Sequence, residues 1–126
     1  MVVLDTSVII DYLRTRELKR TFFEEISKVV GKKNLAISIL TIQELFMGKS
    51  AANEKVEEFL IAIINSLSLL PYNFEVAKKA GEISRVKNIS FPDAAIAATA
   101  MVNNASLFTL NVKDFSGIAG LELYKI

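Results

Sequence analysis

The sequence contains neither cysteine nor histidine in its 126 residues. Without cysteine it can form no disulfide, no thiolate zinc site and no cysteine nucleophile. Without histidine it cannot use a Ser-His-Asp triad, an imidazole general base or a histidine-ligated metal. Any catalysis must therefore rest on carboxylates, hydroxyls, amides, lysine, arginine or tyrosine, together with a hard cation that carboxylates attract.

The chain also lacks an excess of either charge. Lysine and arginine number 15 against 14 aspartates and glutamates, which gives a formal net charge of +1. A nearly neutral protein has no overall attraction to phosphate, so contact with nucleic acid would require local patches. Hydrophobic residues make up 52% of the sequence, which is sufficient for one core. Length and composition together predict a single domain over residues 1–126.

No segment has the pattern of a membrane span or a targeting signal. The most apolar stretch, residues 59–70, is interrupted by Asn65, Ser66 and Ser68 and is too short to cross a bilayer. The amino terminus reaches Asp5 with no preceding basic residue, unlike a signal peptide. We therefore expect a soluble cytoplasmic protein with no membrane partner.

Short apolar runs alternate with helical patterns along the chain. Five runs predict strands: 2–4, 35–39, 68–70, 106–110 and 121–125. No hairpin signal such as Asn-Gly separates them, which favours parallel pairing with helices on both faces. The predicted fold is therefore α/β, a three-layer α/β/α sandwich with a Rossmann-like parallel sheet of about five strands. Residues 94–102 are apolar or small all round, which predicts a helix packed against this sheet.

Four carboxylates share one position relative to these elements. Asp5, Glu44, Asp93 and Asp114 each lie just past a predicted strand or at the start of a predicted helix. The carboxyl ends of parallel strands meet at one edge of a sheet, where ligands bind. We expect Asp5, Glu44 and Asp114 at that edge. Asp93 follows a helix–helix turn, so the pattern alone does not fix its place.

Helix capping explains each acid when it is considered alone. Residues 41–44 and 90–93 match the capping box, in which an acid bonds back to the free backbone N–H at a helix start. Asp5 and Asp114 could be N-caps, and Ser7 is predicted to cap the first helix. Acids in a first turn also gain about 0.3–1 kcal/mol from the helix dipole. Capping does not explain a gathering of four acids, because clustered carboxylates repel each other unless a cation offsets their charge.

The four segments that contain these acids resemble the motifs of PIN-domain nucleases. Residues 4–11 (LDTSVIID) are similar to the opening of that family, and residues 41–45 (TIQEL) to its second acidic motif. Residues 92–100 (PDAAIAATA) are similar to the third motif and residues 109–115 (TLNVKDF) to the fourth. The resemblance spans the whole chain in order, and the compact length is most similar to VapC toxins of bacterial and archaeal toxin–antitoxin pairs.

This resemblance implies a PIN-like fold and an Mg²⁺- or Mn²⁺-dependent endoribonuclease that hydrolyses RNA phosphodiester bonds. Carboxylate oxygens without histidine or cysteine suit these hard cations. Asp5 and Asp93 are expected to bind the metal, which would lower the pKa of a bound water. Glu44 and Asp114 are expected to complete the catalytic set.

Three further residues are expected to have auxiliary roles. Thr6 and Thr109 would position ligands by hydrogen bonds. Many members of the family carry an acid where this chain has Asn111, and others have asparagine with an aspartate three residues later, as here. The fourth role therefore falls to Asp114, to Asn111 as a neutral ligand or orienting group, or to both.

The resemblance also implies partners: an RNA substrate, a cognate antitoxin protein and a second copy of the chain in a homodimer. The alternative from another functional class is a non-catalytic PIN-like module that binds RNA or protein. The intact set of acids weighs against this module, because it would gain nothing from clustered negative charge facing a polyanion.

Overall fold

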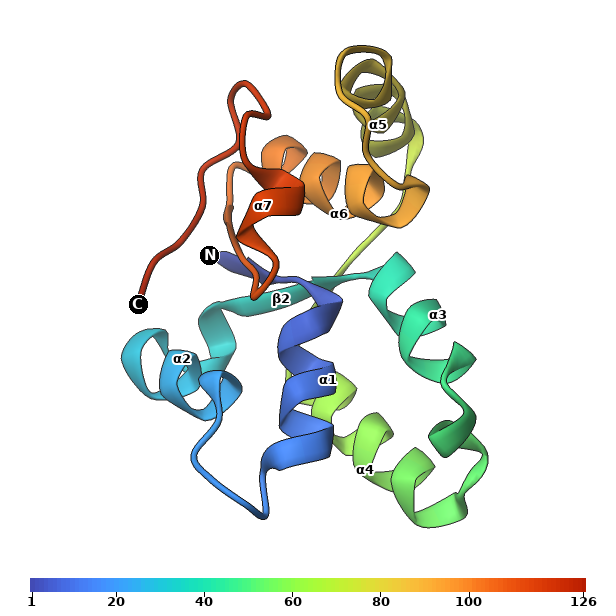
Figure 1. Ribbon diagram of the computed structural model, residues 1–126, viewed down its shortest axis with the longest axis vertical. Helices are drawn as coiled ribbons and strands as arrows, with labels where there is room; N and C mark the ends of the chain where they lie inside the picture. Colours follow the sequence, from blue (N-terminus) through green and yellow to red (C-terminus); the bar gives the residue numbers. More distant parts are fainter.

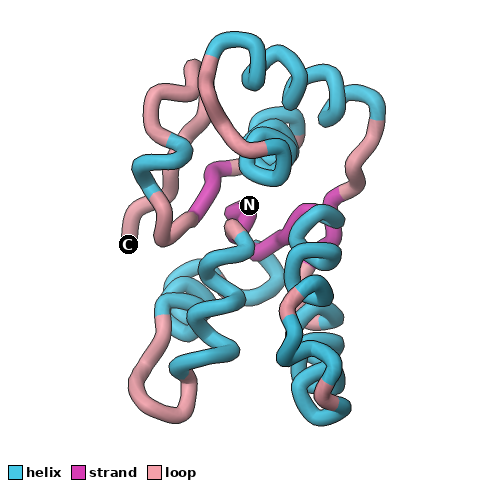
Figure 2. Tube along the Cα trace, turned by 45° about the vertical axis from the view of Figure 1, so that its right-hand side comes forward, coloured by secondary structure: helices cyan, strands magenta, loops and turns pink.

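The computed structural model describes residues 1–126 and is built around one four-stranded parallel sheet (Figures 1 and 2). Its strands are β1 (Val2–Leu4), β2 (Leu35–Ser38), β3 (Ser68–Leu70) and β4 (Ser106–Phe108). They lie in the order β3-β2-β1-β4, and every pairing is parallel. The predicted α/β class and parallel sheet are confirmed.

The predicted fifth strand is wrong, because residues 121–125 form only one isolated bridge, between Leu107 and Leu123. Alternate residues of a parallel strand offer their backbone groups to opposite neighbours. In the three-residue β4, the amide of Ser106 and the carbonyl of Phe108 are bonded toward β1. Only Leu107 offers its amide and carbonyl to the outer edge, to Glu122 and Tyr124. The short β4 therefore has room for a bridge and not for a further strand.

Helices cover both faces of the sheet, as predicted, and Figure 1 shows the two groups below and above it. One group contains α1 (Thr6–Thr15), α2 (Phe22–Val30), α3 (Ile39–Met47) and α4 (Glu54–Asn65). The other contains α5 (Phe74–Val86), α6 (Phe91–Val102) and α7 (Val112–Phe115). Two single turns, η1 (Lys32–Asn34) and η2 (Lys49–Ala52), complete the helical elements.

The strand residues divide between two cores. Val2 and Leu4 join the core shared with α1, α2 and α4, whereas Val3 joins the core shared with α5 and α6. This division follows from the alternation of side chains along a strand. None of the helices combines the length and the hydropathy needed to cross a membrane.

Helix α6 is the most enclosed helix of the chain. Seven consecutive residues, 94–100, are buried, and all are alanine except Ile96 and Thr99. Small side chains allow α6 to pack closely against the sheet and α5 on several sides, as its all-round apolar pattern predicted. This enclosed segment directly follows Asp93, which lies in the first turn of the helix.

Candidate active site

Asp5 lies at the carboxyl end of β1, beside the end of β4. Leu4 pairs with Phe108 in the parallel register, and the amide of Asp5 donates to the carbonyl of Phe108 at 2.9 Å. Thr109, the next residue after β4, therefore stands next to Asp5, and its hydroxyl donates to Asp5 Oδ2 at 2.7 Å. The Asp5 residue is only 3% exposed. Neighbouring strand ends thus fix this carboxylate at the sheet edge.

Ser7 also contacts the Asp5 carboxylate, so its predicted role as a helix cap is wrong. The first turn of α1 brings its hydroxyl to Asp5 Oδ2, to which it donates at 2.7 Å, while it accepts the amide of Leu110 at 3.2 Å. Asp5 occupies the N-cap position of α1, yet its side chain makes no capping bond. Ser7 and Thr109 both bond Oδ2, which leaves Oδ1 of Asp5 without a hydrogen bond from the protein.

Glu44 does not belong to the capping box that its sequence suggests. Helix α3 begins at Ile39, before the predicted start, and its N-cap is Ser38, which accepts the amide of Leu40 at 3.1 Å. Glu44 therefore lies in the second turn, beyond the position from which an acid bonds back to the helix start. Its Oε1 instead accepts a hydrogen bond of 2.6 Å from the hydroxyl of Thr6, which joins α3 to α1.

Asp93 reaches the same edge from the first turn of α6, where Ser90 is the N-cap and accepts the Asp93 amide at 3.2 Å. Burial is the largest cause that raises the pKa of the Asp93 carboxyl above its ordinary value, and the Ser90 hydroxyl partly opposes it. Nearby negative charges raise this pKa further, and they belong to Asp5, Asp114 and Glu44. Carboxylates from three other parts of the chain are therefore close enough to act on Asp93.

One surface cavity joins three of the four acids. It has a volume of about 270 Å³ and is lined by Asp5, Thr6, Ser7, Ile10, Glu44, Met47, Asp93 and Asn111. Asp114 is not on its wall, although its charge acts on Asp93. Asn111 is the N-cap residue of α7, but its side chain makes no capping bond. The residue that the fourth motif contributes to the wall is thus Asn111.

Larger cavities of the surface contain fewer acids, and the one with two of them, Glu17 and Glu24, also contains Arg16, Lys19 and Arg20. A cavity of about 690 Å³ lies at the opposite edge of the sheet beside Met1 and Ser106, and Glu122 is its only acid. The smaller cavity at the carboxyl edge is therefore the better candidate for chemistry, because three carboxylates line it.

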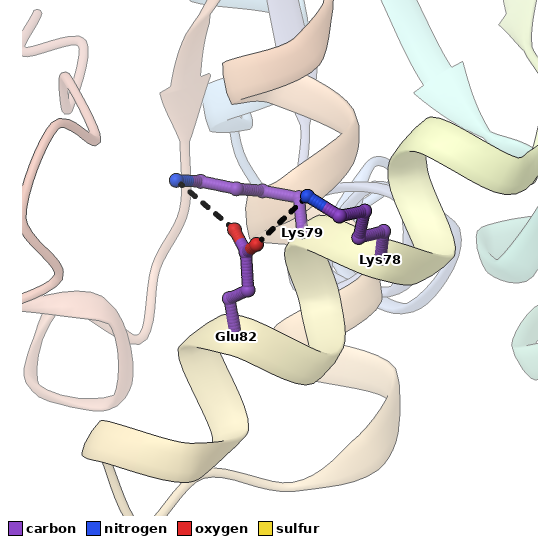
Figure 3. Close-up of polar contacts among 3 residues, drawn as sticks. All are labelled: Lys78, Lys79 and Glu82. Atoms are coloured by element: carbon purple, nitrogen blue, oxygen red, sulfur yellow. Dashed lines mark hydrogen bonds and ion pairs between the residues drawn. The ribbon is translucent and has the colours of Figure 1, made fainter.

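No basic side chain forms an ion pair with the cavity acids. Both ion pairs of the chain lie on α5, where Glu82 contacts Lys78 at 3.1 Å and Lys79 at 3.8 Å (Figure 3). Hydrogen bonding by Lys78 is the main reason that the pKa of the Glu82 carboxyl is lowered. The cavity acids have no such partner, so their charge favours a bound cation.

The side chains of the cavity fit a hard divalent cation when water completes its ligands. No three acidic side chains are close enough to hold one ion among themselves. Asp5 and Asp93 both line the cavity, and Mg²⁺ is commonly bound by one or two carboxylates with several waters. The carboxylate oxygens of Asp5 and Asp93 are thus donor atoms of the kind that such a cation binds.

Two contacts at this edge involve residues for which the sequence pattern predicted only capping. Ser7 lies two residues after Asp5, a spacing at which a hydroxyl can reach a nearby polar group, so a local signal existed. The hydroxyl of Thr41 lies 3.0 Å from that of Thr6, across 35 positions of sequence. No local spacing indicates that second contact.

Residues 2–121 match the sequence model of the PIN domain family. The chain belongs to the PIN domain family. It is similar to Ribonuclease VapC1 of Methanocaldococcus jannaschii, with 31% identity over 133 residues, covering 98% of this chain and 86% of the relative. It is 29% identical to Ribonuclease VapC1 of Rickettsia felis, over 98% of this chain and 95% of that protein.

A solved structure agrees with this family assignment. The crystal structure of DNA-bound VapBC from Salmonella typhimurium has a TM-score of 0.85 to this PIN domain at 25% identity. The match covers 98% of this chain and 96% of that chain. The resemblance to VapC proteins that the four motifs predicted is therefore confirmed.

Proposed function

We propose that this PIN domain is a metal-dependent endoribonuclease and the toxin of a toxin–antitoxin pair. The observation that carries the proposal is the shared cavity wall of Asp5, Glu44 and Asp93, three acids from distant stretches of sequence. No basic side chain pairs with them. The two relatives named Ribonuclease VapC1 support RNA as the substrate. Residues 1–126 are proposed to form the single domain that performs this chemistry.

Asp5 and Asp93 are the residues that would hold Mg²⁺ or Mn²⁺. Ser7 and Thr109 fix Oδ2 of Asp5, so its Oδ1 is available as a ligand. Asp93 is partly buried among like charges, and a neighbouring cation would relieve that repulsion. When bound, the ion would lower the pKa of a water ligand and offset negative charge on the phosphate oxygens.

Glu44 would orient the attacking water and accept its proton. The bond from Thr6 fixes Oε1 of Glu44, which leaves Oε2 to accept a hydrogen bond from water. Asn111 would orient the phosphate or a water from the cavity wall through its amide. Asp114 would act through its charge on Asp93, so the fourth role would be shared.

An antitoxin and a second copy of the chain are the proposed protein partners. The related Salmonella typhimurium structure is of VapBC, which supports an assembly with an antitoxin. Co-expression with the product of a neighbouring gene should give a stable complex with suppressed cleavage. Light scattering on the chain alone should give the mass of a dimer, and a monomer at micromolar concentration would contradict the homodimer.

The nuclease proposal is tested by incubating the purified protein with structured RNAs, with and without Mg²⁺ or Mn²⁺, beside the variant Asp93→Asn. We expect cleavage only with the ion present and its loss in the variant. Glu82→Gln, purified in parallel, is the matched control, because it removes an acid on α5 outside the cavity. Cleavage in the presence of a chelator, or cleavage that survives Asp93→Asn, would contradict the proposal. Binding of RNA without cleavage would favour the non-catalytic module.

A further inference from the structure

Thr41 lies inside α3 and is completely buried. A threonine hydroxyl within a helix commonly bonds a backbone carbonyl one turn earlier. Thr15 and Thr99 do so in this chain, at 2.8 and 2.7 Å. Thr41 makes no such bond, and its one hydrogen-bond partner is the hydroxyl of Thr6 at 3.0 Å. The hydroxyl of Thr41 therefore serves a contact with α1 and not its own helix.

The hydroxyl of Thr6 lies between two oxygen atoms and has only one proton to donate. Its Oγ1 lies 2.6 Å from Glu44 Oε1 and 3.0 Å from Thr41 Oγ1. An ionised carboxylate can only accept hydrogen bonds, so the shorter contact takes the Thr6 proton. Thr41 must then donate to Thr6, because a buried hydroxyl without an acceptor is unfavourable. Thr41 therefore donates to Thr6, and Thr6 donates to the Glu44 carboxylate.

We propose that Thr41 is a positioning residue that fixes the Glu44 carboxylate through Thr6, an inference that rests on the proposed nuclease function. Hydrogen bonds in series polarise and strengthen one another, so the donor behind Thr6 tightens its bond to Glu44. Thr41 is not on the cavity wall, so it contacts neither substrate nor ion. Its loss should disturb the proton acceptor while leaving the proposed metal ligands in place.

The first test compares Thr41→Val, which removes the hydroxyl and keeps the side-chain shape, with Thr41→Ser, which keeps the hydroxyl. Thr41→Val should lower kcat for RNA cleavage roughly tenfold, a loss usual for groups that orient site residues. KM and the Mn²⁺ affinity measured by calorimetry without RNA should stay near their wild-type values. Thr41→Ser should restore kcat, and a serine variant as slow as the valine variant would overturn the proposal.

Thr99→Val is the matched control. Thr99 is also completely buried in a helix, but its hydroxyl donates to the carbonyl of Ala95 within α6 at 2.7 Å. Its other contact, at 3.5 Å, is with Ser38 Oγ, so it touches neither Thr6 nor Glu44. The loss of this hydroxyl should leave kcat near the wild-type value. A loss equal to that of Thr41→Val would mean that any buried hydroxyl has the same effect, and would overturn a specific role for Thr41.

A double-mutant cycle tests the route through Thr6. If Thr41 acts only through Thr6, adding Thr41→Val to Thr6→Val should lower kcat no further. A second, equal loss of kcat in the double variant would show that the two hydroxyls act independently, and would overturn the series.

Crystal structures of the ion-free variants give a readout that does not depend on activity. The Glu44 carboxylate should be ordered in the wild type and in Thr41→Ser, and displaced or disordered in Thr41→Val. An ordered Glu44 with unchanged kcat in Thr41→Val would overturn this inference and leave the proposed function intact. A wild type that cleaves no RNA would overturn the proposed function, and the order of Glu44 would still decide the role of Thr41.

Discussion

The hydroxyl of Thr109 donates a hydrogen bond of 2.7 Å to Oδ2 of Asp5, although the two residues are 104 positions apart. The same hydroxyl accepts the amide of Asn111 at 2.9 Å. Thr109 is 6% exposed, so water cannot readily replace these bonds. One buried side chain therefore orients the carboxylate at the end of β1 and also shapes the turn that brings Asn111 to the cavity.

Thr109→Val should impair metal binding and cleavage together. Valine would leave the Asn111 amide unpaired and would remove one of the two donors to Asp5 Oδ2. Losses of such orienting bonds typically lower metal affinity or activity by about 10–100-fold. Calorimetric titration with Mn²⁺ and RNA cleavage assays measure the two effects. Thr109→Ser keeps the hydroxyl and should retain most of both, so equal losses in the two variants would contradict this role.

The place of Asp5 at the sheet edge could be predicted from the sequence because the pattern that decides it is local. A short apolar run followed by Asp5 indicates a strand end, and the all-round apolar residues 94–102 indicate an enclosed helix behind Asp93. Parallel strands then bring such ends to one edge. The cavity wall contains Asp5 and Glu44, as these elements indicate, whereas the place of Asp93 beside them follows a helix–helix turn that the pattern did not fix. The catalytic roles of the three acids stay a prediction.

The hydrogen bonds that hold the acids could not be predicted, because they join distant residues. Thr6 reaches Glu44 across 38 positions, and no repeat or spacing marks this pair. The sequence pattern predicted that α3 starts at Thr41 and placed Ser38 in the preceding strand, although both are good N-cap residues. The structure uses Ser38, which turns Thr41 inward toward Thr6. The predicted fifth strand is absent because β4 ends at Phe108, and the apolar run 106–110 predicted a longer strand there.

Mg²⁺ or Mn²⁺ should raise the melting temperature of the wild-type protein. A ligand that binds only the folded state adds stability by mass action, about 2.7 kcal/mol at a concentration 100 times its Kd. Asp5→Asn removes a charged ligand from the cavity and should abolish the rise, while Glu82→Gln should retain it. Differential scanning fluorimetry with and without the ion measures this shift. An equal rise in Asp5→Asn would exclude Asp5 as a metal ligand.

Thr21→Ala should destabilise α2 without affecting the cavity. Thr21 accepts the amide of Glu24 at 3.4 Å, and the carboxylate of Glu24 accepts the amide of Thr21 at 2.9 Å, a complete capping box. Loss of a threonine N-cap typically costs about 1 kcal/mol. Urea denaturation should show this fall in the free energy of unfolding, and Thr21→Ser should largely avoid it. Equal stability of Thr21→Ala and wild type would mean that the cap is not used.

The stability of the metal-free protein should depend on pH through Asp93. Burial and neighbouring charges raise the pKa of its carboxyl in the folded state. Between the ordinary pKa of aspartate and this raised value, the folded chain binds more protons than the unfolded chain. Stability therefore falls as pH rises from the ordinary pKa of aspartate to the raised value. Asp93→Asn should melt at a higher temperature than wild type at neutral pH, and the difference should shrink as pH falls through this interval.

Glu82 provides a control of opposite sign for the same measurement. Hydrogen bonding by Lys78 lowers the pKa of the Glu82 carboxyl, so its stabilising effect is present above the ordinary pKa of glutamate and is lost as pH falls through the lowered value. Glu82→Gln should therefore melt slightly below wild type at neutral pH, by a small margin because the pair is on the surface. Melting curves in a chelator, from acidic to neutral pH, measure both variants. If Asp93→Asn also melted below wild type at neutral pH, the Asp93 carboxylate would be favourable in the metal-free fold, and the repulsion that makes a cation necessary would be absent.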